Sequence, residues 1–194
     1  LNPDGSIDNT FMYDGVGAGQ SSGFNSTAGR SAMGIGDGTI IVNSPSTNEY
    51  STYQTGAAAA VTVLNVALGA DKTLVRINPN GSLNSVIAQG TQFEDGGAAP
   101  TTNEFVVQPD GKIICAGRFS GYNGNTVNCI VRMDALGTID AAFLANTGTG
   151  VDPSLYEILG VDLMPNGWIM VGANAAADFN GVPSKGLVRL TQTG

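Results

Sequence analysis

Histidine is absent from this sequence of 194 residues, and cysteine and basic residues are scarce. Without histidine the chain has no Ser-His-Asp or Cys-His catalytic centre, and it lacks the commonest ligand of transition metals. Its two cysteines are too few for a disulfide framework or for a four-ligand zinc site. The glycine-rich stretch at 15–20 follows no clear strand and opens no helix, so we interpret it as a loop without a phosphate-binding role.

Positive charge is also scarce, with 8 Lys and Arg against 16 Asp and Glu and a net charge of −8. Nucleic acids and anionic membrane surfaces attract clustered Lys and Arg, which this chain lacks. The longest apolar stretch, 56–70, is interrupted by Thr62 and Asn65 and is shorter than the roughly 20 residues that span a bilayer. We therefore expect no nucleic-acid partner and no membrane insertion. The start at Leu1 without Met leads us to expect a processed product or an excerpt of a longer chain.

Glycine and neutral polar residues are abundant instead. The chain has 28 glycines and 42% hydrophobic residues but only 12% charged residues, against about 25% in ordinary soluble domains. Apolar runs separated by Gly, Asn, Ser and Thr are typical of β proteins with many tight turns. Surfaces built on neutral polar groups are typical of secreted and virion proteins.

Two sequence signatures recur. The first is an apolar-Arg-apolar strand end followed by a glycine turn, whole or truncated at 1–11, 74–87, 130–143 and 187–194. Its arginines are Arg76, Arg132 and Arg189, and its turn glycines Gly5, Gly81, Gly137 and Gly194 are 76, 56 and 57 residues apart. The second is a polar-Gly turn followed by an apolar run, at 36–42, 109–117 and 165–173. Together they predict a repeat of 56–57 residues with an enlarged first copy.

Each repeat is expected to form three or four short antiparallel strands. In the second copy, strands are predicted at 104–107, 113–115 and 129–133. Tyr122-Asn123-Gly124, matched by Phe179-Asn180-Gly181 in the third copy, predicts a hairpin because Asn-Gly favours the required turn. No segment shows a 3.6-residue period bounded by helix caps, so no helix is predicted.

The motifs LNPDGSIDNTF, VVQPDGKIICAGRFSGYNG and IVRMDALGTIDAAF resemble the delta-sixty repeat, a β-propeller-type repeat of bacterial surface and phage-associated proteins. The resemblance is close over 107–143 and departs in the first copy, where GDGTIIV lacks the proline and the Asn-Gly hairpin is missing. It implies an all-β, propeller-like repeat of antiparallel blades. About three units are too few for a closed propeller of 4–8 blades. A longer chain, closure by other chains and an open stack all remain alternatives.

We predict one repeat domain over 1–194, with units at about 1–80, 81–136 and 137–194. The first unit carries a hairpin insertion at 43–71. Loops of repeat scaffolds often carry function, so Tyr50 and Tyr53 in the insertion are candidate contact residues. The alternative is a longer hairpin or packing arm without a ligand.

Three further aromatic residues are candidates for binding a partner or a glycan. Tyr122 and Phe179 head hairpins equivalent to the insertion, although they could instead tuck under their own turns. Trp168 stands where the other units have Lys112 and Thr39, on the side away from the core, which suggests an interface.

The remaining titratable groups suggest structural roles. The repeated arginines either form a basic ring or pair with turn carboxylates and fix blade geometry. The aspartates recur at turn positions, where local hydrogen bonding explains them better than glycosidase chemistry. NPDGSIDN at 2–9 resembles a calcium loop without its bidentate Glu, so a Ca²⁺ site has weak support and no other metal or cofactor is expected. Cys115 and Cys129 should lie near one another across a hairpin, either bonded or as buried thiols.

These observations favour a non-enzymatic structural or binding module of an extracellular or virion surface assembly, such as a fibre, appendage or adhesin. Its partners would be other chains of the assembly or the remainder of a longer chain. The alternative is a glycan-binding, lectin-like propeller, and an enzyme acting on glycosides is a distant third.

Overall fold

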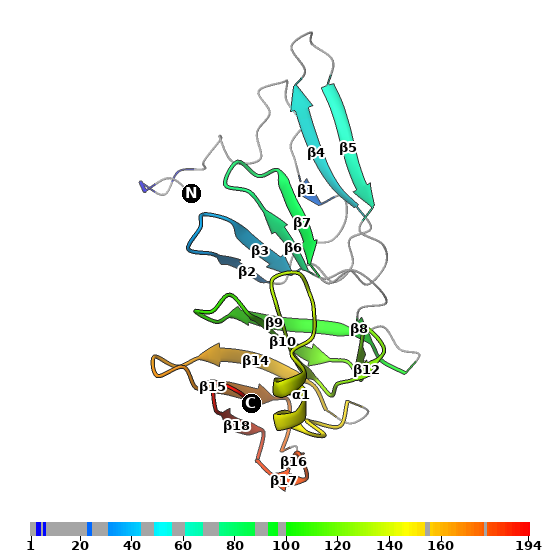
Figure 1. Cartoon of the computed structure of the whole chain (residues 1–194), viewed down its shortest axis with the longest axis vertical. Coiled ribbons are helices and arrows are strands. Elements are labelled where there is room, and N and C mark those ends of the chain that lie inside the picture. The colour runs from blue at the N-terminus through cyan, green and yellow to red at the C-terminus, as the bar shows by residue number, and fades with distance from the viewer. Residues whose placement is uncertain are drawn as a thin grey trace. The chain divides into compact units, whose positions relative to one another are not determined.

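The computed structural model describes residues 3–4, 6, 23–24, 31–43, 49–55, 61–67, 74–87, 93–96, 100–153, 156–176 and 178–194. They belong to two compact units, Leu1–Val86 and Ile87–Gly194. Nearly all of the regular structure described is antiparallel β-strand (Figure 1). The assignment of 1–194 to one domain stays a prediction.

The first unit contains one four-stranded sheet, which we call blade 1. Its strands in spatial order are β2 (Ser31–Gly34), β3 (Ile40–Asn43), β6 (Leu74–Ile77) and β7 (Leu83–Ile87). Val75 and Ile77 are buried, and partly buried side chains such as Val42 and Leu83 pack on them. Alternation along β6 sends Arg76 to the opposite face, where it lies across from Ile41.

The predicted insertion of the first repeat contains a long hairpin. β4 (Glu49–Thr55) pairs with β5 (Val61–Ala67), and β1 (Gly23–Phe24) pairs with the outer edge of β4. The hairpin connects β3 to β6, where the other repeats have a short Asn-Gly hairpin. The insertion thus lengthens an existing hairpin within the same repeat pattern.

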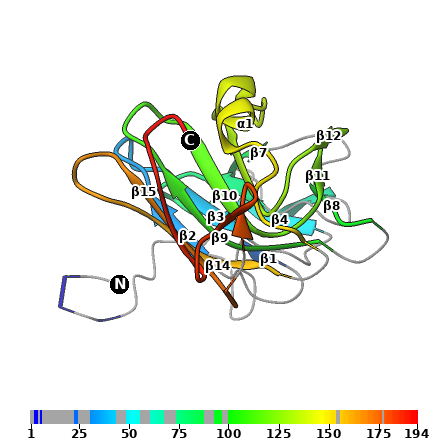
Figure 2. The same ribbon diagram turned by 90° about the horizontal axis from the view of Figure 1, so that it is seen from below.

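The second unit contains two further repeat sheets, which lie against each other (Figures 1 and 2). Blade 2 comprises β9 (Thr101–Val107), β10 (Ile113–Arg118) and β13 (Ile130–Met133), with β10 in the centre. Blade 3 comprises β14 (Ile158–Leu163), β15 (Ile169–Ala173) and β18 (Leu187–Leu190), with β15 in the centre. The turn-strand signature supplies the central strand of each blade, and the apolar-Arg-apolar signature supplies its neighbour.

The blades have short hairpins at their ends. β8 (Phe93–Glu94), β11 (Gly121–Tyr122) and β12 (Asn125–Thr126) form one small sheet, and β16 (Asp178–Phe179) pairs with β17 (Val182–Pro183). Asn123 and Gly124 have φ of 48° and 73°, and Asn180 and Gly181 have 51° and 74°. Two successive positive φ values are those of the type I′ turn that Asn-Gly favours. The predicted hairpins are therefore confirmed.

Blade 2 contains a close backbone approach. The register of β9 and β10 shifts between Ala116 and Gly117, so that two neighbouring residues of β10 face Glu104 and Thr102. A Cβ atom on Gly117 would lie 2.8 Å from Thr102 Cα and closer still to the Thr101 carbonyl oxygen. The bulge therefore requires glycine here.

The prediction that no helix occurs is wrong for one segment. α1 (Ala141–Thr147) begins after Asp140, whose carboxylate accepts hydrogen bonds from the backbone N–H of Ala142 and Phe143. The helix has only 7 residues, too few to show a helical period. The missed signal was the N-cap aspartate.

The described turn glycines that recur in the repeat have positive φ angles, as expected for tight turns. Gly81 and Gly137 have φ of 84° and 88°, a left-handed conformation that disfavours other residues. Gly5 lies outside the described residues. None of the described helices is long or apolar enough to cross a membrane.

Cys115 and Cys129 are free, buried thiols. Cys115 lies opposite Val131 and Phe105, so Cys129 stands two residues before the residue that faces Cys115 on the neighbouring strand. Cys129 precedes β13 and has a φ of 66°. Burial raises the pKa of both thiols, to about 11 for Cys129, which keeps both protonated and unreactive.

Candidate functional site

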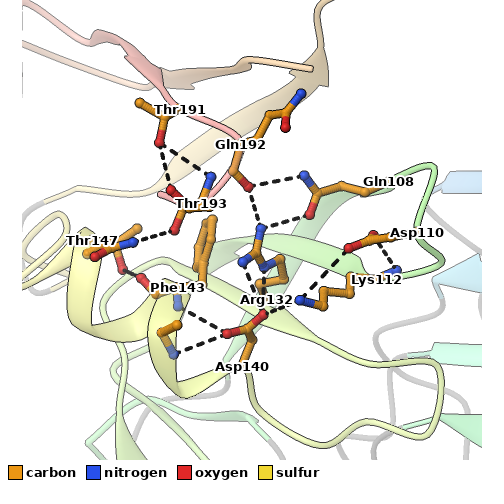
Figure 3. A network of polar contacts seen from close by, with 12 residues as sticks. Gln108, Asp110, Lys112, Arg132, Asp140, Phe143, Thr147, Thr191, Gln192 and Thr193 are labelled. Carbon is orange, nitrogen blue, oxygen red and sulfur yellow. Dashed lines mark hydrogen bonds and ion pairs between the residues drawn. The ribbon is translucent and has the colours of Figure 1, made fainter. Parts of the chain in front are cut away.

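A buried arginine lies at the centre of the densest polar network described (Figure 3). Arg132, on β13, is only 5% exposed. Its Nη2 lies 3.0 Å from Asp140 Oδ2, and its Nε donates to the same oxygen at 3.1 Å. Lys112 Nζ donates to Asp140 Oδ2 at 2.8 Å. One carboxylate thus pairs with two cations and also caps α1.

The same contacts lower the pKa of Asp140 to about 2. The hydrogen bond from Lys112 is the largest cause, and the Phe143 N–H and the charge of Arg132 add to it. Burial works in the opposite direction and is outweighed. Asp140 is therefore ionised across the physiological range and holds its protein partners firmly.

Arg132 also joins blade 2 to the end of blade 3. Its Nη1 donates to Gln108 Oε1 at 3.0 Å and to the backbone carbonyl of Gln192. On the other side, the Phe143 ring centre lies 4.5 Å from the guanidinium carbon. Asn146 Nδ2 of α1 donates to the Thr193 carbonyl at 2.9 Å. The turn after β18 is thus fastened to the preceding repeat.

A pocket of about 330 Å³ opens beside this network. Its walls include Gln108, Lys112, Met164, Pro165 and Gln192. Both carboxylates near its charged end, those of Asp110 and Asp140, pair with Lys112 at 3.8 Å and 2.8 Å. The described residues contain no cluster of three or more His, Cys, Asp or Glu side chains that could hold a metal.

The other two repeated arginines have different partners. Arg76 Nε donates to Thr39 Oγ1 at 2.8 Å, and its Nη2 lies 2.9 Å from Asp37 Oδ2. The guanidinium carbon of Arg189 lies 4.1 Å from the ring centre of Trp168.

In blades 1 and 3 the arginine contacts the residue that follows the turn glycine of the central strand, which is Thr39 or Trp168. In blade 2 that residue is Lys112, and it shares the Asp140 carboxylate with Arg132. Trp168 is half-buried, and Arg189 covers one face of its ring, the face that a sugar or a partner side chain would use.

Tyr122 and Phe179 lie beneath their own hairpins and are not presented to a partner. They are 0% and 7% exposed. The Tyr122 ring centre lies 5.0 Å from that of Phe93, and its hydroxyl donates to the Gly137 carbonyl at 2.6 Å. Tyr50 and Tyr53 lie in β4 opposite Val66 and Val63, and their side chains lie outside the described part of the structure.

Tyr122→Phe should lower the free energy of unfolding by about 1–2 kcal/mol. The change keeps the buried ring but removes the hydrogen bond to the turn carbonyl of Gly137, which is then left without that donor. Chemical denaturation of the two proteins measures the difference. Equal stability would show that the hydroxyl does not contribute.

Blades 2 and 3 share an equivalent face that is covered in blade 2 and uncovered in blade 3. On blade 2 this face is formed by Val106, Ile114, Ala116, Ile130 and Arg132, each 5% exposed or less. β14 of blade 3 packs against the β9 and β10 part of this face. Val161 N–H donates to Glu104 Oε2 at 3.1 Å, and Asn103 Nδ2 donates to the Ile158 carbonyl at 2.8 Å.

The equivalent residues of blade 3 form what we call the open face: Asp162, Met170, Gly172, Leu187 and Arg189. Leu187 is 62% exposed, whereas its counterpart Ile130 is 2% exposed. A hollow of about 290 Å³ runs along this face. A repeated face is therefore covered in one blade and uncovered in the next.

The repeated sheets match a known family model. A model described as a domain of unknown function (DUF5122) beta-propeller matches residues 108–143 and 165–194. The chain contains β-propeller-type repeats. The matched segments are the equivalent parts of blades 2 and 3, and the predicted fold class, all-β with propeller-like blades that do not close, is confirmed. No curated protein and no solved structure matches the chain.

Proposed function

We propose that this β-propeller-type repeat protein is a non-enzymatic structural or binding module that joins other protein chains in a surface assembly. Its open face would dock a blade of another copy. The observation that supports the proposal is the contrast between Ile130, which is buried in blade 2, and its counterpart Leu187 in blade 3, which is exposed. Burying such a leucine side chain is worth about 1.5–3 kcal/mol.

The partner is expected to be a blade because a blade covers this face within the chain. β14 contributes buried Ile158 and Val161 to the sheet that lies against β9 and β10. A second chain that offers a similar apolar strand would fit the exposed Leu187 and the half-buried Met170. The open face also presents one acidic and one basic residue, Asp162 and Arg189, which favours a polar rim around an apolar centre.

We also propose that the repeats are of the delta-sixty type, which fits the motif over 107–143. An extracellular, cell-surface or virion location fits the low content of charged residues. The insertion hairpin β4–β5 remains a candidate contact element, together with Tyr50 and Tyr53.

Leu187→Asp should abolish self-association. In analytical ultracentrifugation, the apparent mass of the wild-type protein should exceed the mass of one chain and should increase with protein concentration. The variant should keep the mass of one chain. Leu136→Asp is the matched control, because Leu136 is 80% exposed but lies in a turn of blade 2 outside the open face. It should behave as the wild type.

Two results would contradict this function. One is a wild-type chain that stays monomeric at every concentration, and the other is association that survives Leu187→Asp. A monomer that binds one glycan tightly on a glycan array would favour the lectin-like alternative instead.

A further inference from the structure

The edge of β18 differs from the same edge in the other two blades. In blade 1, β7 lies beside β6, and in blade 2, Ile139 forms a bridge with Met133 of β13. Within the described residues β18 pairs only with β15. A strand edge without a neighbour presents backbone N–H and C=O groups that can pair with another chain.

Blade 2 shows which chemistry occupies this edge. After the turn at Gly137, the Asp140 N–H donates to the Arg132 carbonyl at 2.8 Å. The Asp140 carboxylate then pairs with the Arg132 guanidinium, and Phe143 stacks on it. The occupying segment therefore has the pattern Gly-Thr-Ile-Asp-x-x-Phe, over 137–143.

Blade 3 has a groove and an arginine at the equivalent strand edge, but no described segment occupies them. A groove of about 550 Å³ follows β18 and is lined by Phe179, Val182, Leu187, Arg189 and other residues. Val182 and Leu187 are 64% and 62% exposed. Arg189 is exposed and stacks on Trp168, and it makes no ion pair with the described residues. An arginine that lines an apolar groove suits a ligand with one carboxylate and one aromatic ring.

The chain carries a second copy of the occupying pattern. Residues 5–11 read Gly-Ser-Ile-Asp-Asn-Thr-Phe and match 137–143 at the glycine, the hydroxyl residue, the isoleucine, the aspartate and the phenylalanine. The third copy, 81–87, has Asn84 and Ile87 in place of the aspartate and phenylalanine, and in that blade Arg76 pairs with Asp37 instead. In blade 2 the aspartate of the pattern pairs with Arg132. In blade 1 the pattern lacks the aspartate, and Arg76 has a different carboxylate partner.

We propose that the groove beside β18 binds the segment Gly5–Phe11 of a second copy of this chain. The segment would add a strand to β18, with Asp8 paired to Arg189 and Phe11 on the guanidinium face opposite Trp168. A second copy of the chain carries both the groove and the segment, so one contact of this kind can link copies into an assembly. The inference rests on the proposed function and names the partner at blade 3.

A peptide with the sequence of residues 5–15 tests the recognition directly. The receptor is the protein with Asp8→Asn and Phe11→Ala, so that its own segment does not compete. Trp168 is the single tryptophan of the chain and lies against Arg189, so its fluorescence should change saturably as peptide is added. The peptide with Asp8→Asn should bind about tenfold more weakly, the loss expected for one charge-assisted hydrogen-bonded pair.

Arginine variants of the receptor provide the controls. Arg189→Gln should weaken the wild-type peptide by the same factor, and Asp8→Asn in the peptide should then cause no further loss. Arg76→Gln, the equivalent change in blade 1, should leave binding unchanged. No saturable change, equal affinity for the two peptides, or equal loss in Arg76→Gln would overturn the proposal.

The mass of the full-length chain separates this inference from the proposed function. Asp8→Asn alone should weaken self-association, and free peptide should compete with it. If Leu187→Asp dissociates the assembly while Asp8→Asn and the peptide have no effect, docking at the open face stands and strand donation is wrong. Peptide binding by a wild-type chain that is always monomeric would also overturn donation by a second copy.

Discussion

Asp140→Ala should lower the free energy of unfolding by about 3–5 kcal/mol, the loss typical of breaking one side of a buried ion pair. Arg132 is 5% exposed, so the variant would leave its charge buried beside Lys112 without the carboxylate that both share. The change also removes the N-cap of α1, which is worth about 1 kcal/mol. Urea denaturation measures the effect.

Asp110→Ala is the matched control for this experiment. Asp110 pairs with the same Lys112, but at 3.8 Å and with its side chain 55% exposed. Exposed pairs contribute about 0–1 kcal/mol, so the control should remain close to wild type. An equally small loss in Asp140→Ala would mean that the network does not stabilise the second unit.

Acid should remove the charge-dependent part of this contribution. The pKa of Asp140 is about 2 in the folded protein, against 3.8 for the free side chain. Because the folded value is lower, the ionised carboxylate stabilises the fold above pH 3.8, and this stabilisation is lost as the pH falls towards 2. Asp140→Asn keeps a capping side chain, so its stability gap to wild type, about 2 kcal/mol near neutral pH, should shrink over that range. A gap that does not change with pH would contradict the ion pair.

Gly117→Ala should be at least as damaging, with a loss of about 3 kcal/mol or more, or failure of the second unit to fold. The added Cβ would meet the backbone at Thr101 and Thr102, and a backbone atom cannot rotate away as a side chain can. The central strand of blade 2 would have to give up its bulge. Thermal unfolding followed by circular dichroism measures the change.

Gly34→Ala is the control for the glycine experiment. Gly34 also lies in a strand, but a Cβ there meets nothing within 4 Å. The substitution should be neutral or slightly stabilising, because alanine loses less chain entropy than glycine on folding. If both variants behaved alike, the close approach at Gly117 would not be the cause.

The repeat made much of the fold predictable. Positive-φ glycines such as Gly111, and Asn-Gly turns such as Asn123-Gly124, specify local backbone geometry, so the strands around them could be placed from sequence. The recurrence of Arg76, Arg132 and Arg189 in one signature likewise indicated that they occupy equivalent positions, and each lies opposite the second residue of the central strand of its blade. These features depend on neighbours in the sequence, which is why the sequence reveals them.

Features that depend on distant residues could not be predicted in this way. The sequence left open whether Tyr122 faces a partner or tucks under its own turn, because its partners, the Gly137 carbonyl and the Phe93 ring, are 15 and 29 residues away. The link from Arg132 to the carbonyl of Gln192 joins residues 60 positions apart and uses a backbone atom that has no sequence signature. α1 was missed because a single aspartate sets where it begins.

The three repeated arginines have one further consequence. In a chain of identical repeats, a strand could pair with the wrong copy at little cost, and folding could stall in a shifted arrangement. Here Arg76 meets a threonine and an aspartate, Arg132 meets an aspartate shared with a lysine, and Arg189 meets a tryptophan. Exchanging β13 with β18 would place Arg189 beside Lys112, and Arg132 beside a tryptophan without Asp140. The different partners of the three arginines thus favour pairing of each strand within its own blade of a repetitive chain.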